Sequence, residues 1–81
     1  MKIAVLTFAR IREIVGAGTL ERELPGDATA GDAWAALARD FPALADLRAS
    51  TRMARGGSLV DAGTPLREGD ELALLPPFGG G

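Results

Sequence analysis

The chain has 81 residues, of which 47% are hydrophobic and 25% are charged, and its formal net charge is −2. This composition is typical of one small soluble domain and argues against a disordered segment, while the acidic balance argues against a nucleic-acid or anionic-membrane surface. The chain contains no Cys and no His, which excludes disulfides, thiolate nucleophiles, the usual zinc ligands and histidine general bases, so we expect no metal site.

The first ten residues (MKIAVLTFAR) do not form a complete signal peptide, because Arg10 interrupts the short apolar run. No stretch of the sequence approaches the length of a membrane-spanning helix. We therefore expect a cytoplasmic protein with no membrane partner.

The first predicted element is a strand over residues 2–8 (KIAVLTF), which are apolar or β-branched on both alternating faces. This pattern is typical of a strand with a neighbour on each side, and it places Phe8 in the core. Aliphatic residues then recur at helical spacing from 11 to 15 and are followed by Gly16, which predicts a short helix or a turn ended by glycine.

Residues 18–24 (GTLEREL) alternate, with Leu20 and Leu24 facing the core and charged residues facing water, as in a half-buried second strand. The main helix is predicted next. Thr29 followed three residues later by Asp32 approximates a capping box. The helix presents one apolar stripe, and Pro42 ends it; the stripe consists of Trp34, Leu37, Ala38 and Phe41.

The last third of the chain predicts a helical fragment over residues 42–48 and three short strands. Gly56-Gly57 can supply the positive φ angles of a tight hairpin turn between the first two of these strands. The turn REGD precedes a final strand over residues 71–75, and Pro76 and Pro77 remove two backbone donors, so the sheet must end there. Four or five strands curled around one helix give an α+β roll.

Three segments of the sequence carry a family resemblance: VLTFARIREIVG, LPGDATAGDAWAALARDFPAL and DAGTPLREGDELALLPPFGGG. Together they resemble the MoaD type of ubiquitin-like sulfur carrier, the small subunit of molybdopterin synthase in the MoaD/ThiS family. The third segment is the most specific, because it combines a strand, two prolines and terminal glycines. The resemblance implies a β-grasp domain with a mixed sheet over residues 1–75 and a flexible Gly-Gly tail over residues 76–81.

The resemblance also implies a function for the C-terminal carboxylate of Gly81 in molybdenum cofactor biosynthesis. An ATP-dependent enzyme would adenylate this carboxylate and convert it to a thiocarboxylate. The sulfur would then pass to a pyranopterin precursor in the large catalytic subunit of a heterotetrameric synthase. The chain itself would be a non-catalytic subunit with no bound cofactor, since ATP is used by the activating enzyme.

The residues before Gly81 suit the insertion of a tail into a partner. Pro76 and Pro77 favour a stiff, extended exit from the sheet. Gly79 and Gly80 lack a Cβ, so their backbone can lie against the walls of a narrow channel. Phe78 would serve as an apolar anchor for the partner.

Other interpretations remain open at this stage. Carriers of the same type serve thiamine, cysteine or tRNA thiolation. Phe78 could instead fold back and cap the core. The chain could also be a β-grasp interaction module that binds through its sheet face, with an incidental tail.

Overall fold

The computed structural model describes residues 1–77, and the predictions for Phe78, Gly79, Gly80 and Gly81 lie outside these described residues. The elements follow one another in the order expected from the sequence. They are β1 (Lys2–Thr7), α1 (Ala9–Val15), β2 (Thr19–Glu23), α2 (Ala30–Asp40), the 3₁₀ helix η1 (Pro42–Ser50), β3 (Arg52–Arg55), β4 (Ser58–Val60) and β5 (Glu71–Leu75).

The five strands form one mixed sheet in the order β2-β1-β5-β3-β4. The first and last strands of the chain, β1 and β5, pair in parallel at its centre, and all other pairs are antiparallel. The prediction that the first strand has a neighbour on each side is therefore confirmed. Because β5 lies between β1 and β3, the chain beyond Leu75 leaves from the middle of one end of the sheet.

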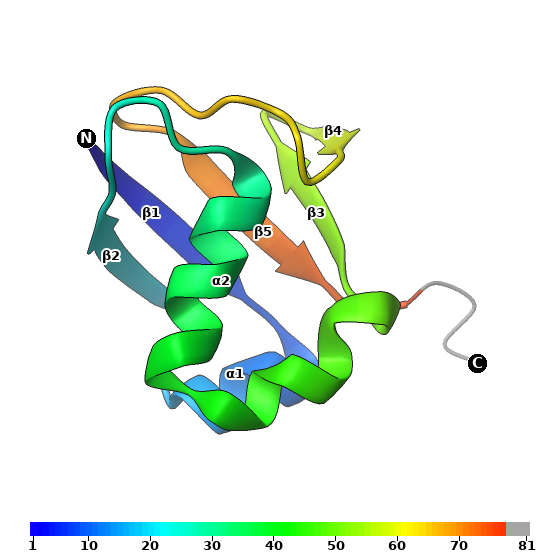
Figure 1. Cartoon of the computed structure of the whole chain (residues 1–81). Helices are drawn as coiled ribbons and strands as arrows, with labels where there is room; N and C mark the ends of the chain where they lie inside the picture. Colours follow the sequence, from blue (N-terminus) through cyan, green and yellow to red (C-terminus); the bar gives the residue numbers. More distant parts are fainter. Residues whose placement is uncertain (78–81) are drawn as a thin grey trace.

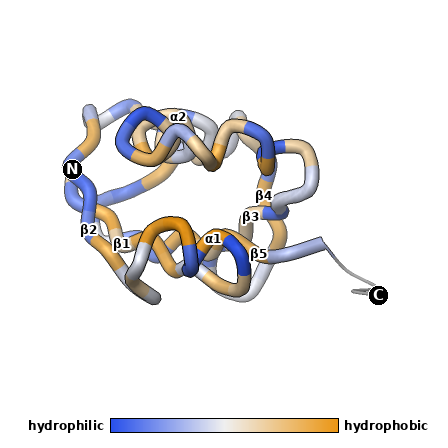
Figure 2. The backbone as a smooth tube through the Cα atoms, turned by 90° about the horizontal axis from the view of Figure 1, so that it is seen from below, coloured by the Kyte–Doolittle hydropathy of each residue, from blue (hydrophilic) through white to orange (hydrophobic). Residues whose placement is uncertain are grey.

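One face of the sheet and the apolar stripe of α2 enclose the core (Figure 1). Along α2, hydrophobic and hydrophilic segments alternate, as expected of a helix with one buried side (Figure 2). Trp34 and Leu37 of this stripe are buried, whereas Ala38 and Phe41 are partly buried at its edge. Their sheet partners are the inward residues Ile3, Val5, Leu72 and Leu74, each no more than 1% exposed.

We expect the substitution Leu72→Ala to lower the free energy of unfolding by about 2–5 kcal/mol, because it removes a fully buried side chain and leaves a cavity. The total free energy of unfolding of a small domain is about 5–15 kcal/mol, so this loss is a large part of it. The matched control is Leu59→Ala. Because Leu59 is 52% exposed, this substitution should lower the free energy of unfolding far less. Urea unfolding of both variants measures the difference, and equal losses would contradict the assignment of Leu72 to the core.

The predicted ends of the helices are confirmed. Thr29 Oγ1 accepts a hydrogen bond from the Asp32 backbone N–H at 3.2 Å, and Asp32 Oδ2 accepts one from the Thr29 N–H at 2.9 Å, which completes the capping box. The helix α2 ends at Asp40, and Pro42 begins η1. Gly16 follows α1 in the left-handed conformation with φ 83°. These local signals therefore fixed the helix boundaries correctly.

The predicted hairpin and final turn are also confirmed. Gly56 and Gly57 join β3 to β4 with φ angles of 59° and 84°. In the turn of residues 67–70, the Asp70 N–H donates to the Arg67 carbonyl oxygen at 3.0 Å, and Gly69 has φ 83°. The last strand then runs over residues 71–75, as the sequence predicts.

The prediction that Phe8 lies in the core is wrong, because its side chain is 43% exposed. The strand β1 ends one residue earlier, at Thr7, whose side chain points inward and is 2% exposed. Alternation along the extended chain therefore places Phe8 on the outer side. Ala9 follows with φ 51° and turns the chain directly into α1, so Phe8 stays at the surface.

Candidate functional site

Pro76 and Pro77 are the two predicted partner-binding residues that the structure places, and both are exposed directly after β5. They lie at the end of the sheet where β1 leads into α1 and where η1 leads into β3 (Figure 1). The predicted roles of Phe78, Gly79, Gly80 and Gly81 stay predictions. The described part of the chain thus defines where the tail begins, which we call the tail root.

A small apolar groove of about 60 Å³ lies beside the tail root. The start of α1, the end of η1 and the two prolines form its walls. The lining residues are Phe8, Ala9, Arg10, Ile11, Leu47, Ser50, Thr51, Pro76 and Pro77. The exposed ring of Phe8 therefore adjoins the point where the tail leaves the domain, and the two together offer apolar surface to a partner.

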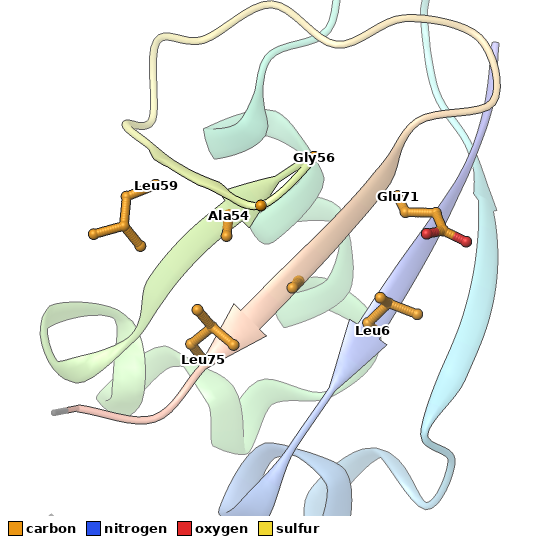
Figure 3. Close-up of a pocket in the computed structure, with 8 residues that line it drawn as sticks. Leu6, Ala54, Gly56, Leu59, Glu71 and Leu75 are labelled. Carbon is orange, nitrogen blue, oxygen red and sulfur yellow. The ribbon is translucent and has the colours of Figure 1, made fainter.

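A second, larger hollow of about 390 Å³ lies on the outer face of the sheet, away from α2 (Figure 3). Strand pairing aligns four apolar residues across it: Leu6 opposite Ala73, Ala73 opposite Ala54, and Ala54 opposite Leu59. We call these four residues the outer row. Leu75 also lines the hollow and is followed directly by Pro76, so the apolar face continues to the tail root.

The outer row is the most exposed apolar region of the sheet. Leu59 is 52% exposed, and Leu6, Ala54 and Ala73 are half-buried, in contrast to the fully buried inner residues of the same strands. Contiguous apolar surface of this kind marks interaction sites in soluble proteins. The fold therefore places a candidate docking face next to the tail root.

Asp70, one of the two neighbouring carboxylates at the start of the last strand, has a structural role. Its Oδ2 accepts a hydrogen bond from the Arg67 N–H at 2.8 Å and lies 3.4 Å from Arg55 Nη1. Within residues 1–77, no three acidic side chains converge as metal ligands. No helix in this range is long and apolar enough to cross a membrane.

Sequence reasoning did not identify the outer row as a binding face. The pattern did contain a sign of it, because β1 and β5 are apolar on both of their faces, with Leu6 and Ala73 on the side opposite the core. For the first strand, that pattern predicted a neighbour on each side and cover on at least one face, and it did not say whether the second face is covered. Leu59 could not be placed, because the register of the hairpin was not readable from the sequence.

Known proteins resemble this chain over most of its length. Residues 5–81 match the ThiS family. Small archaeal modifier protein 1 from Haloferax volcanii is 38% identical over 82 residues, which cover 91% of this chain and 94% of the relative. Its crystal structure aligns with a TM-score of 0.87 and 34% identity over all of both chains.

Two further proteins connect the chain to molybdopterin synthesis. The molybdopterin synthase sulfur carrier subunit of Arabidopsis thaliana is 32% identical over 81 residues, covering 100% of this chain and 84% of the relative. A structure from Helicobacter pylori, the complex of subunits 1 and 2 of molybdopterin-converting factor, aligns with a TM-score of 0.71 and 26% identity over all of both chains.

These comparisons confirm the β-grasp fold that the sequence implied. The family match also extends through the four terminal residues that the structure does not describe. The chain therefore belongs to the ThiS family of ubiquitin-like sulfur carriers.

Proposed function

We propose that this chain is the sulfur carrier subunit of a molybdopterin synthase and that the terminal carboxylate of Gly81 carries the sulfur. The observation that supports this proposal best is the position of the tail root at the edge of an uncovered apolar sheet face. A partner that covers this face is in position to receive the last residues of the chain. The full-length similarity to named carrier subunits supports the same conclusion.

The proposed chemistry needs only the main chain of this protein. A free carboxylate is a poor electrophile, so the activating enzyme first joins it to AMP at the expense of ATP, with release of pyrophosphate. Sulfide (HS⁻) from the sulfur donor then attacks the carbonyl carbon, AMP leaves with the electrons of the broken C–O bond, and the proton passes to solvent. The product is a thiocarboxylate, and the absence of Cys and His from this chain does not hinder the reaction.

The geometry of the tail root agrees with delivery of sulfur into a partner. The six residues after Leu75 could span about 20 Å if extended, at about 3.3–3.6 Å per residue. This length is enough to reach a buried site while the domain stays outside. We propose the large catalytic subunit and the ATP-dependent activating enzyme as the two partners, in line with the two-subunit complex from Helicobacter pylori.

Intact mass spectrometry tests the proposal. The full chain is incubated with the activating enzyme of the same organism, ATP and a sulfur donor. We expect the mass gain of one oxygen-to-sulfur exchange, and fragmentation should place it at Gly81. The same incubation without ATP is the control. No mass change under complete conditions, with an activating enzyme that is active on another carrier, would refute the proposal.

A second candidate function is attachment of the chain to other proteins, which the 38% identity to small archaeal modifier protein 1 favours. In this case a lysine amine, in place of the sulfur nucleophile, would attack the adenylated Gly81 and release AMP. The same incubation in the presence of cell proteins distinguishes the two. Protein adducts linked through Gly81, without a thiocarboxylate intermediate, would favour the modifier function.

A further inference from the structure

Two arginines flank the tail root: Arg10 of α1, which lines the groove with Pro76 and Pro77, and Arg52 of β3, which pairs with Leu75. They come from two of the three segments that meet at this point, residues 8–11 and 47–52, and the third segment is residues 75–77. None of these segments contains an Asp or a Glu, and the nearest acidic residues in the sequence are Glu13 and Asp46. We call the two arginines the basic collar.

Contacts in the structure fix the position of each member of the basic collar. Arg10 lines the groove beside the two prolines, its side chain is 70% exposed, and its Nη1 lies 3.4 Å from the equally exposed Glu13. Such an exposed pair is weak and leaves the guanidinium accessible. Arg48 of η1 donates to the Thr51 carbonyl oxygen at 3.4 Å and lies over the ring of Trp34 in α2, so it is not a member of the collar. Arg52 pairs with Leu75, the last residue before the prolines.

The opposite end of the outer sheet face has the opposite charge. Four exposed glutamates gather near the start of β1; they are Glu21, Glu23, Glu68 and Glu71. The cations there are Lys2, Arg67 and the N-terminal amine, which lies 3.3 Å from Glu23, so the glutamates outnumber the cations. The six residues of β1 separate the two ends by about 17 Å. This separation exceeds the Debye length of about 8 Å at physiological ionic strength, so a partner responds to the nearer end and not to the net charge.

We infer that the basic collar recognises an acidic rim, formed by Asp and Glu side chains, around the opening through which a partner enzyme receives the tail. This inference rests on the proposed function and adds the charge character of the partner surface. An acidic rim attracts the tail root and repels the glutamate-rich end. The chain is thereby oriented with its tail toward the opening during the encounter.

The length of the tail favours a protein surface over a nucleotide phosphate as the target of the collar. The nucleotide must bind at the carboxylate of Gly81, which extended geometry places up to about 20 Å from Leu75. The collar lies at the start of this stretch and so faces the outside of the opening. The net charge of −2 and the glutamate-rich end disfavour a nucleic acid as the partner.

The test compares two single variants that change the net charge equally. Arg10→Glu reverses the collar residue beside the two prolines, and Arg39→Glu is the matched control at an exposed position of α2. We measure kcat/KM for conversion of the full chain by its activating enzyme at increasing salt. At low salt, kcat/KM of the collar variant should fall about tenfold through a higher KM, and kcat/KM of the control should change less than twofold. The difference should vanish near 1 M salt, where the Debye length is about 3 Å.

Several outcomes would overturn the inference. Equal kinetics of the collar and control variants, with an active wild-type chain, would overturn it while leaving the proposed function intact. A loss that persists at high salt, or that the variant Arg10→Gln reproduces in full, would indicate a packing role. Collar-dependent binding of a single-stranded DNA oligonucleotide would indicate a nucleic-acid site. A wild-type chain that is never activated would overturn both proposals.

Discussion

Deletion of Gly81 should lower the rate of thiocarboxylate formation by about a hundredfold or more and leave the domain folded. The chain that lacks Gly81 still ends in a glycine carboxylate, at Gly80, so the intrinsic reactivity of the terminal carboxylate is unchanged. Its carbonyl carbon is nevertheless displaced by one residue, about 3.3–3.6 Å, from the position that the activating enzyme requires. Misplacement of a reacting atom by about 1 Å can already cost about a hundredfold. Intact mass against time measures the rate.

The matched control is Gly81→Ala, which keeps the length of the tail and adds one methyl group. We expect a smaller loss for this variant than for the deletion. The chain that lacks Gly81 should still bind the large subunit in part, through the sheet face. If the chain that lacks Gly81 is converted at the wild-type rate, the activating enzyme does not require the position of the Gly81 carboxylate, and the assignment of the reaction to Gly81 is wrong.

The elements that the sequence predicted correctly depend on local chemistry. A capping box at Thr29 and Asp32 fixed the start of α2, and paired glycines at positions 56 and 57 fixed the hairpin. Each of these features acts within a few residues, so the sequence contains the whole signal. Proline at position 76 likewise marked the end of β5.

The features that the sequence did not predict depend on which segments meet in space. Phe8 has a large apolar side chain, as core residues do. It is exposed because β1 ends at Thr7 and the chain turns at Ala9. The basic collar joins Arg10 to Arg52 across 42 positions of the chain, through the pairing of β3 with β5 and the packing of α1 beside it. The chemistry of the tail, in contrast, was inferred from the family resemblance and not from the fold.

The outer row gives a second prediction with a large expected effect. The substitution Ala73→Lys places a charge at the centre of this row, between Leu6 and Ala54. We expect the affinity for the large subunit to fall by about 2 kcal/mol, because a docked partner would bury the ammonium group among apolar residues, with Glu71 at the end of the hollow as its acidic neighbour. Titration calorimetry with the purified large subunit measures the change, and urea unfolding checks that the domain remains stable.

The matched control for this prediction is Ala35→Lys on the exposed side of α2, which introduces the same side chain away from the sheet face. It should bind the large subunit as the wild type does.

Ala73→Lys should also raise KM in the sulfur-transfer reaction without changing the reactivity of Gly81, whereas deletion of Gly81 affects the reaction more than the binding. This opposite pattern follows if the sheet face docks and the tail reacts. Equal affinity of the two lysine variants would show that the partner does not use the outer row, and the Phe8 groove beside the tail root would then be the next apolar surface to test as the docking site.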